Sequence, residues 1–286
     1  LVEDSPLWRY IVDFFYYIGV EPTLIVLLAL SFIFFLNKQI FTYLRLVYSA
    51  AIRQRITQIQ RNSMFDKYLN ADTSYHDSLP VGNLVNVITT EVTEAVGGIM
   101  APAGLIVYII MLFAYLVVLA LLSWETTLLS VVILLLASRI PHIWIKKSKH
   151  TGRKLAGSNI LMSEFLVGRL QSPRLVRLAG TGAAEKKEFH ELTQVQRKYS
   201  VLSSILQSRT EVAIEPIVIG LSLIFLYISY MMMNLQIEII GLYLAIAFRL
   251  LPIAKGVLFQ WQKVQTSLGS VEMVENKLKV MQNSIE

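Results

Sequence analysis

Cysteine is absent from this sequence of 286 residues, and charged residues make up only 16% of it. Without cysteine the chain forms neither a disulfide bond nor a thiolate metal site. Cysteine usage therefore does not indicate whether the protein faces an oxidising or a reducing compartment. Soluble domains contain about a quarter charged residues, so a chain this poor in charge is unsuited to a purely aqueous environment. Glycine (14 residues) and proline (8 residues) are also sparse, which favours long helices over a loop-rich or barrel architecture.

Hydrophobic residues take the place of the missing charges. They form 55% of the chain, and its mean hydropathy is +0.55. A membrane-spanning helix needs about 20 mainly apolar residues. The stretches of this kind are residues 22–43, 102–122, 126–144, 212–233 and 237–254. The sequence therefore predicts an all-α membrane protein, with these spans in a single transmembrane domain that covers residues 1–286.

Basic residues are distributed unevenly between the predicted spans. On one side of the membrane, residues 1–21 and the two short turns contain a single basic residue, Arg9. On the other side, residues 45–67 contain five and residues 146–209 contain thirteen. Because basic loops stay in the cytoplasm, the second side is predicted to face it, and the chain to cross the cytoplasmic (inner) membrane several times. Topology thus accounts for the pI of 9.4, and no nucleic-acid partner is expected.

The cytoplasmic stretches are predicted to continue the spanning helices. These extensions are residues 45–100, 146–210 and 255–286. They keep apolar side chains at helical spacing and contain few helix breakers apart from Ser172-Pro173 and the Gly180–Gly182 turn. A continuous helix from Pro22 to Leu69 would be about 70 Å long, whereas the bilayer core is about 30 Å thick. We therefore expect about half of such a helix to protrude from the membrane.

Two turns reverse the chain at the far ends of these extensions. The first begins at Ser74 and is closed by Pro80 and Gly82, and the second is a basic turn from Arg174 to Ala184. The residues alone are also explained if each turn does nothing more than reverse the chain.

The order and spacing of these features resemble the membrane domain of ATP-binding-cassette (ABC) exporters, a family that includes lipid and lipid-linked-oligosaccharide flippases and peptide exporters. In that family the first reversal contains an aromatic pair with Asp, a following Gly, and an aliphatic run that ends in Thr/Ser-x-Asp/Glu-Val. The matching residues in the first reversal are Tyr75, Asp77, Gly82, Leu84, Val85, Ile88, Thr89, Glu91 and Val92. The outer Ser123-Trp124 turn also resembles the family, as do Gly180, Glu185 and Phe189 of the second reversal. His76 departs from the family pattern in the first reversal, where an aromatic residue is usual. Ala183 departs from it in the second reversal, where an acidic residue is usual.

The resemblance covers nearly the whole chain and implies an ABC exporter-type helical bundle. It implies that residues 73–82 and 174–184 are coupling helices, which dock on nucleotide-binding domains that hold ATP and Mg²⁺. The implied contacts are Tyr75, His76, Asp77, Gly82, Arg177, Gly180 and Glu185. The family has six spans per half, so the chain corresponds to the second to sixth spans, without the first span and the nucleotide-binding domain. The other implied partners are membrane lipid and a second transmembrane half, identical or different.

The implied function is ATP-driven export or flipping of an amphipathic substrate by alternating access. No catalytic or metal site is predicted in the chain itself. The phosphate-binding pattern G-x-x-x-x-G-K-[ST] is absent, since the nearest stretch, Gly180 to Lys186, lacks the second glycine. The four histidines show no paired metal spacing. An enzymatic activity would therefore come from an ATPase domain outside this segment.

Three basic residues fall inside the predicted spans, where charges are rare and usually functional. Lys38, Arg139 and Arg249 lie about 13–16 residues from the outer helix ends, or roughly 20–24 Å deep. We predict that they hold an anionic head group in a central cavity, with Glu215 as a further cavity residue. In the alternative, Lys38 and Arg139 extend to the inner interface and Arg249 pairs with Glu215, although the level of Glu215 fits Lys255 better.

Two other functions would account for part of the sequence. A proton-coupled peptide transporter of similar membrane fold would use buried carboxylates, for which Glu211 and Glu215 are candidates. A non-transporting membrane scaffold would account for the spans, but it gives no reason for helices of this length. The sequence identifies neither the substrate nor the organism.

Overall fold

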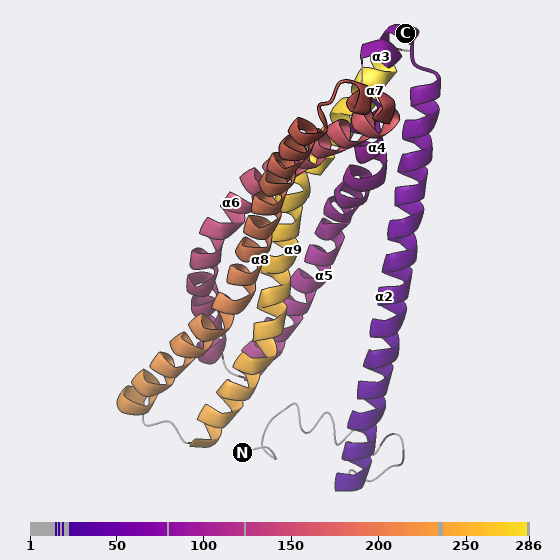
Figure 1. Cartoon of the computed structure of the whole chain (residues 1–286). Helices are drawn as coiled ribbons and strands as arrows, with labels where there is room; N and C mark the ends of the chain where they lie inside the picture. Colours follow the sequence, from indigo (N-terminus) through magenta and orange to yellow (C-terminus); the bar gives the residue numbers. More distant parts are fainter. Residues whose placement is uncertain are drawn as a thin grey trace. The chain divides into compact units, whose positions relative to one another are not determined.

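A computed structural model describes residues 15, 17, 19, 23–78, 80–122, 124–233 and 237–284. Every regular element in this part of the chain is a helix, which confirms the predicted fold class (Figure 1). The chain divides into two compact units, Leu1–Arg55 and Ile56–Glu286, and each is considered by itself. Helix α2 (Leu24–Leu69) begins in the first unit and ends in the second.

Long helices build the bundle of the second unit. They are α5 (Val92–Leu122), α6 (Trp124–Gln171), α8 (Gly182–Met233) and α9 (Ile237–Asn283). The short elements are α3 (Thr73–Ser78), α4 (Val81–Asn86), the π-helical turn η1 (Val87–Glu91) and α7 (Pro173–Leu178). Figure 1 shows α3, α4 and α7 at the end of the bundle where α9 terminates. Both predicted reversals are therefore at the same end of this unit.

The long helices exceed the thickness of a bilayer. Helices α6 and α8 contain 48 and 52 residues, which at 1.5 Å per residue gives about 72 and 78 Å. Among the described residues, two helices are long and apolar enough to span a membrane, Leu24–Leu69 and Val81–Val117. The other predicted spans include side chains outside the described part. The number of spans and the cytoplasmic side of the extensions therefore stay predictions.

The break between α6 and α8 follows from two residue types. Helix α6 ends at Gln171, and Pro173 opens α7 at a position where a helix needs no backbone N–H. After α7, Gly180 has a φ of +67°, a left-handed conformation that glycine adopts without a steric penalty. The sequence predicted both breaks, and the structure places them at the two ends of α7.

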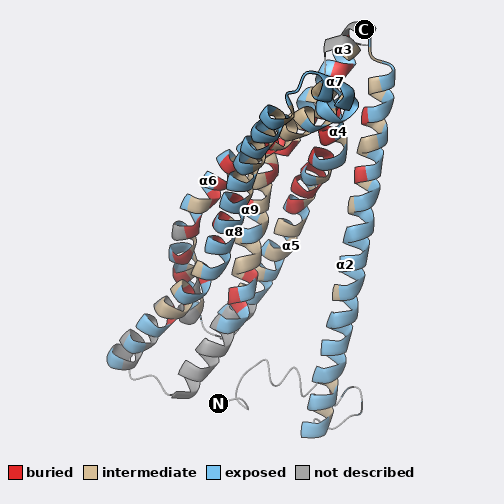
Figure 2. Ribbon diagram, viewed as in Figure 1, coloured by how far each residue is buried: buried red, intermediate tan, exposed pale blue. Residues whose placement is uncertain are grey.

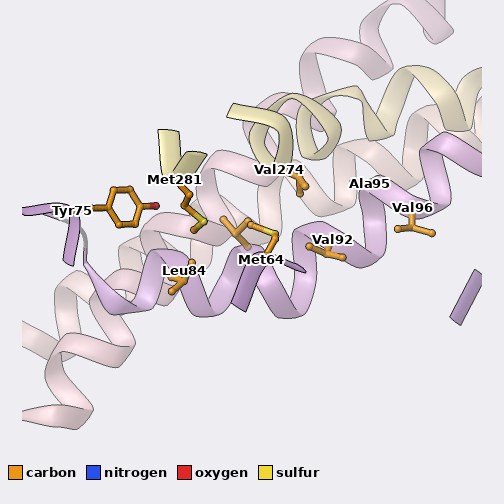
Figure 3. Packing of buried hydrophobic residues seen from close by; sticks show 9 residues of the cluster. Met64, Tyr75, Leu84, Val92, Ala95, Val96, Val274 and Met281 are labelled. Carbon is orange, nitrogen blue, oxygen red and sulfur yellow. The ribbon is translucent and has the colours of Figure 1, made fainter. Parts of the chain in front are cut away.

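The main core of the second unit lies close to the α3–α4 end (Figure 3). Its buried members are Met64, Tyr75, Leu84, Val87, Val92, Ala95, Val96, Val274 and Met281. Met64 of α2 and Met281 of α9 are both 0% exposed, so residues far apart in sequence meet here. A smaller cluster consists of Ala137, Ile214, Val218 and Leu251. Figure 2 shows the buried residues where α5, α6 and α9 lie together, whereas α8 is largely exposed.

Candidate coupling and substrate sites

The first reversal is anchored in the core. The ring of Tyr75 in α3 is 5% exposed and lies in the cluster that contains Met64 and Met281 (Figure 3). Burial raises the pKa of Tyr75, so its phenol stays neutral at physiological pH. His76 packs edge-on against Tyr68, with ring centroids 4.5 Å apart. His76 thus makes an aromatic contact at the position where the resembled family usually has an aromatic residue. The side chain of Asp77 lies outside the described part.

Gly82 allows α4 to approach α6 at backbone distance. A Cβ at this position would meet the backbone oxygen of Ser163 and would lie 2.6 Å from Glu164 Cα. Beside this contact, Asn83 Nδ2 donates a hydrogen bond to Glu164 Oε1 at 2.6 Å. Any residue larger than glycine would push the two helices apart. The first reversal is therefore fixed to α6 as well as to the core.

The second reversal is exposed. No residue of α7 is buried, and Leu175 and Leu178 are 66% and 85% exposed. Arg177 is exposed as well, and a Cβ at Gly180 would meet no atom within 4 Å. Large apolar side chains beside basic ones, uncovered by the chain itself, are typical of a protein-docking surface.

A polar and aromatic contact joins α6 to α8 just behind this exposed turn. Arg169 Nε donates to Glu185 Oε2 at 2.5 Å, and the guanidinium lies 4.9 Å from the centroid of the Phe165 ring. Phe165 in turn stacks on Phe189 with centroids 6.0 Å apart. Glu185, predicted as a docking contact, is thus engaged within its own chain. This pair connects the two helices that flank α7, and the docking role of Glu185 stays a prediction.

The predicted cation layer is distributed over both units. Lys38 belongs to the first unit, whereas Arg139 and Arg249 belong to the second, so the second unit contains only part of the set. All three are exposed, and Arg139 and Arg249 have no ion-pair partner among the described residues. Glu215 Oε2 accepts a hydrogen bond from Lys255 Nζ at 2.7 Å. The helix level of Glu215 predicted this pair, and the alternative pairing with Arg249 is not seen.

Sequence reasoning did not assign a role to Glu91, which proves to be the centre of a buried polar cluster. Glu91 is 1% exposed and ends the π-helical turn η1. Its Oε1 accepts from Asn86 Nδ2 at 3.2 Å and Asn159 Nδ2 at 3.3 Å, and its Oε2 accepts from Ser270 Oγ at 2.6 Å. Asn159 Oδ1 also accepts from Gln196 Nε2 at 3.4 Å. One carboxyl group therefore connects α4, α6 and α9, and indirectly α8.

Arg61 of α2 supports the same turn from outside. Its Nε and Nη2 donate to the carbonyl oxygens of Ile88 and Thr89 at 3.0 and 2.7 Å, and Nη2 also donates to Thr93 Oγ1 at 2.9 Å. A π-helical turn interrupts the regular helical hydrogen bonds and is frequent at functional sites. The sequence signal for this cluster was Glu91 in the Thr-x-Glu-Val pattern, with Glu94 three residues later. Local pattern alone could not reveal its partners.

Burial raises the pKa of Glu91, and the hydrogen bonds from Ser270, Asn159 and Asn86 offset this only in part. The folded state therefore retains a proton at a pH where the unfolded chain has lost it. Stability conferred by the neutral group is fully present below the ordinary carboxyl pKa, and it falls as pH rises through the raised pKa.

The Glu91→Gln variant is expected to remove this pH dependence. Its Nε2 can donate to Ser270 as a protonated carboxyl would, and its Oε1 can accept from both asparagines. We expect thermal melts followed by tryptophan fluorescence to coincide with the native protein at pH 4. Above the ordinary carboxyl pKa, the variant should become the more stable protein. The exposed Glu191→Gln should show no such trend, and a Glu91→Gln difference that is constant with pH would contradict the account.

No group of three or more His, Asp or Glu side chains in the described part of the chain is placed to hold a metal ion. His76 is occupied by its aromatic contacts, and His190 Nε2 lies 2.8 Å from Gln194 Nε2.

Comparison with known proteins gives the same picture. The model of the family described as the ABC transporter transmembrane region matches residues 6–250. The chain is 21% identical over 239 residues to the Heterocyst differentiation ATP-binding protein HepA of Nostoc sp. (strain PCC 7120), covering 84% of this chain and 39% of that protein. The structure of this chain is similar to that of a bacterial Atm1-family ABC exporter with ATP bound, with a TM-score of 0.72.

The structural match extends over 91% of this chain and 47% of the exporter, at 13% sequence identity. The chain thus spans less than half the length of both relatives. At this level of identity the structural likeness establishes the fold.

Proposed function

Because the chain belongs to the ABC transporter transmembrane region family, we propose that it forms the membrane-spanning part of an ATP-driven exporter or flippase. It moves an amphipathic substrate across the cytoplasmic membrane by alternating access. The observation that carries this proposal is a pair of helices, α6 and α8, about 72 and 78 Å long, joined by a turn whose residues the chain leaves unburied.

The partners of this turn are nucleotide-binding domains, which hold ATP and Mg²⁺. Helix α7 offers them apolar contacts through Leu175 and Leu178 and positive charge through Arg174 and Arg177. The α3–α4 reversal offers a second, firmer contact, because Tyr75 anchors it in the core. A second transmembrane half, identical or different, completes the transporter, and membrane lipid covers the apolar surface.

Movement at α7 reaches the membrane through continuous helices. The Arg169–Glu185 ion pair and the Phe165–Phe189 stack hold α6 and α8 together behind the turn, so both helices move with it. A rigid element of this length transmits displacement that a flexible linker would absorb. Substrate-stimulated ATP hydrolysis by the intact protein in proteoliposomes tests the proposal, and a scaffold would show none.

The substrate is anionic in this proposal, because Lys38, Arg139 and Arg249 are exposed cations at one predicted depth. Replacing all three by glutamine should reduce ATP-driven flipping of a fluorescent acidic phospholipid by about tenfold, which corresponds to the loss of about 1.4 kcal/mol. Flipping of a zwitterionic phospholipid should change little. Equal retention of both activities would contradict an anion-binding role. Replacement of the three exposed lysines Lys186, Lys187 and Lys198 by glutamine removes the same number of charges and is the matched control.

A further inference from the structure

Gln262 of α9 is 1% exposed, but its side-chain amide is only half satisfied. Its Nε2 donates to Ser148 Oγ of α6 at 2.9 Å, and Ser148 Oγ donates to the carbonyl oxygen of Trp144 at 3.1 Å. No described residue donates a hydrogen bond to Gln262 Oε1. Because a buried acceptor without a donor costs free energy, this oxygen favours a ligand that supplies an N–H or O–H group.

Two cavities of about 280 and 230 Å³ meet at Gln262. Gln207 of α8 and Phe259 of α9 line both of them, so the two cavities adjoin along one stretch of the α8–α9 interface. A water molecule occupies about 30 Å³ in the liquid. The larger cavity is therefore wide enough for a small organic molecule in contact with Gln262.

An exposed carboxylate, Glu211, is part of the lining of the larger cavity. Lys255 lines it, but the Lys255 ammonium is already paired with Glu215 at 2.7 Å. Glu211 lines the same cavity and has no ion-pair partner among the described residues. Tyr108 and Phe259 contribute aromatic rings to the wall. A free carboxylate, an amide oxygen and aromatic faces together favour a cation that donates a hydrogen bond.

We propose that this cavity is a binding site for an organic ammonium compound that carries at least one N–H. The N–H donates to Gln262 Oε1, Glu211 balances the charge, and the apolar part of the ligand packs against Phe259 and Tyr108. All these groups belong to one unit of one chain. Binding therefore requires neither ATP nor a second half, and the inference stands apart from the proposed transport function.

Calorimetric titration of the intact protein in lipid nanodiscs tests the site, with empty nanodiscs as the control for partitioning into lipid. The probe is 2-phenylethylammonium, and we expect saturable binding of one molecule per chain. Its N,N,N-trimethyl analogue keeps the charge and the ring but has no N–H. We expect the analogue to bind at least about tenfold more weakly, because it cannot satisfy Gln262 Oε1.

Variants separate the acceptor from its support. Gln262→Leu removes Oε1 and should weaken binding of 2-phenylethylammonium by about tenfold, whereas Ser148→Ala removes only the amide's anchor and should preserve binding within about twofold. Glu211→Gln should weaken binding by up to about fivefold. Absence of saturable binding, or equal binding of the ammonium and trimethyl compounds to the native protein, would overturn the proposal, even if Gln262→Leu fails to fold.

Discussion

Replacing Gly152 by alanine should lower the free energy of unfolding by about 1–3 kcal/mol, because the new methyl group overpacks a backbone contact. A Cβ at Gly152 of α6 would meet the carbonyl oxygen of Thr266 in α9. The contact is reciprocal, since a Cβ at Gly269 of α9 would lie 2.7 Å from Arg153 Cα. Backbone atoms cannot rotate away as a flexible side chain can, so the two helices must separate.

Gly157 provides the matched control on the same helix. A Cβ at Gly157 would meet no atom within 4 Å, and alanine is favoured over glycine inside a helix by up to about 1 kcal/mol. Thermal melts should therefore shift downwards for Gly152→Ala and slightly upwards for Gly157→Ala. Shifts of the same sign and size would show that α6 and α9 do not make the close contact described here.

Replacing Leu178 by aspartate should abolish most ATP-driven transport while leaving the fold intact. The side chain is 85% exposed, so the chain itself loses almost no packing. At a docked interface, however, the new carboxylate would be desolvated and unpaired, which we expect to reduce ATP-driven flux by roughly tenfold or more. Flux and thermal stability measured on the same proteoliposome preparation test both statements.

Leu161→Asp is the control for a general effect of a new surface charge. Leu161 is 55% exposed on α6, the helix that leads to α7, but it does not belong to the turn. Its flux should stay close to that of the native protein. Normal flux in Leu178→Asp would remove α7 from the docking surface, and a lowered melting temperature would assign its role to folding instead.

Local and compositional signals predicted the fold. Apolar runs, scarce helix breakers and the distribution of basic residues indicated an all-helical membrane domain with helices longer than the bilayer. Pro173 and Gly180 predicted the two breaks around α7, because proline and glycine act on their own backbone. Counting along two adjacent helices was sufficient to match Glu215 with Lys255, since both helices rise by the same distance per residue.

Contacts between segments that are distant in the chain could not be predicted from the sequence. Glu91 meets Asn159 and Ser270, which are 68 and 179 residues away, and Gln262 meets Ser148 114 residues away. No periodicity encodes such distances, which depend on how the packed helices cross. Whether Lys38 lies near Arg139 and Arg249 also depends on how the helices pack, and their shared site stays a prediction.

The energy source of transport tests the central claim most directly. Flux of fluorescent amphiphiles into proteoliposomes should be measured with ATP and no proton gradient, and then with a proton gradient and no ATP. An ABC exporter predicts flux in the first condition alone, with the Glu211→Gln variant still dependent on ATP. Flux driven by the proton gradient without ATP, and lost when Glu211 or Glu215 is replaced by glutamine, would contradict the account and indicate a proton-coupled carrier.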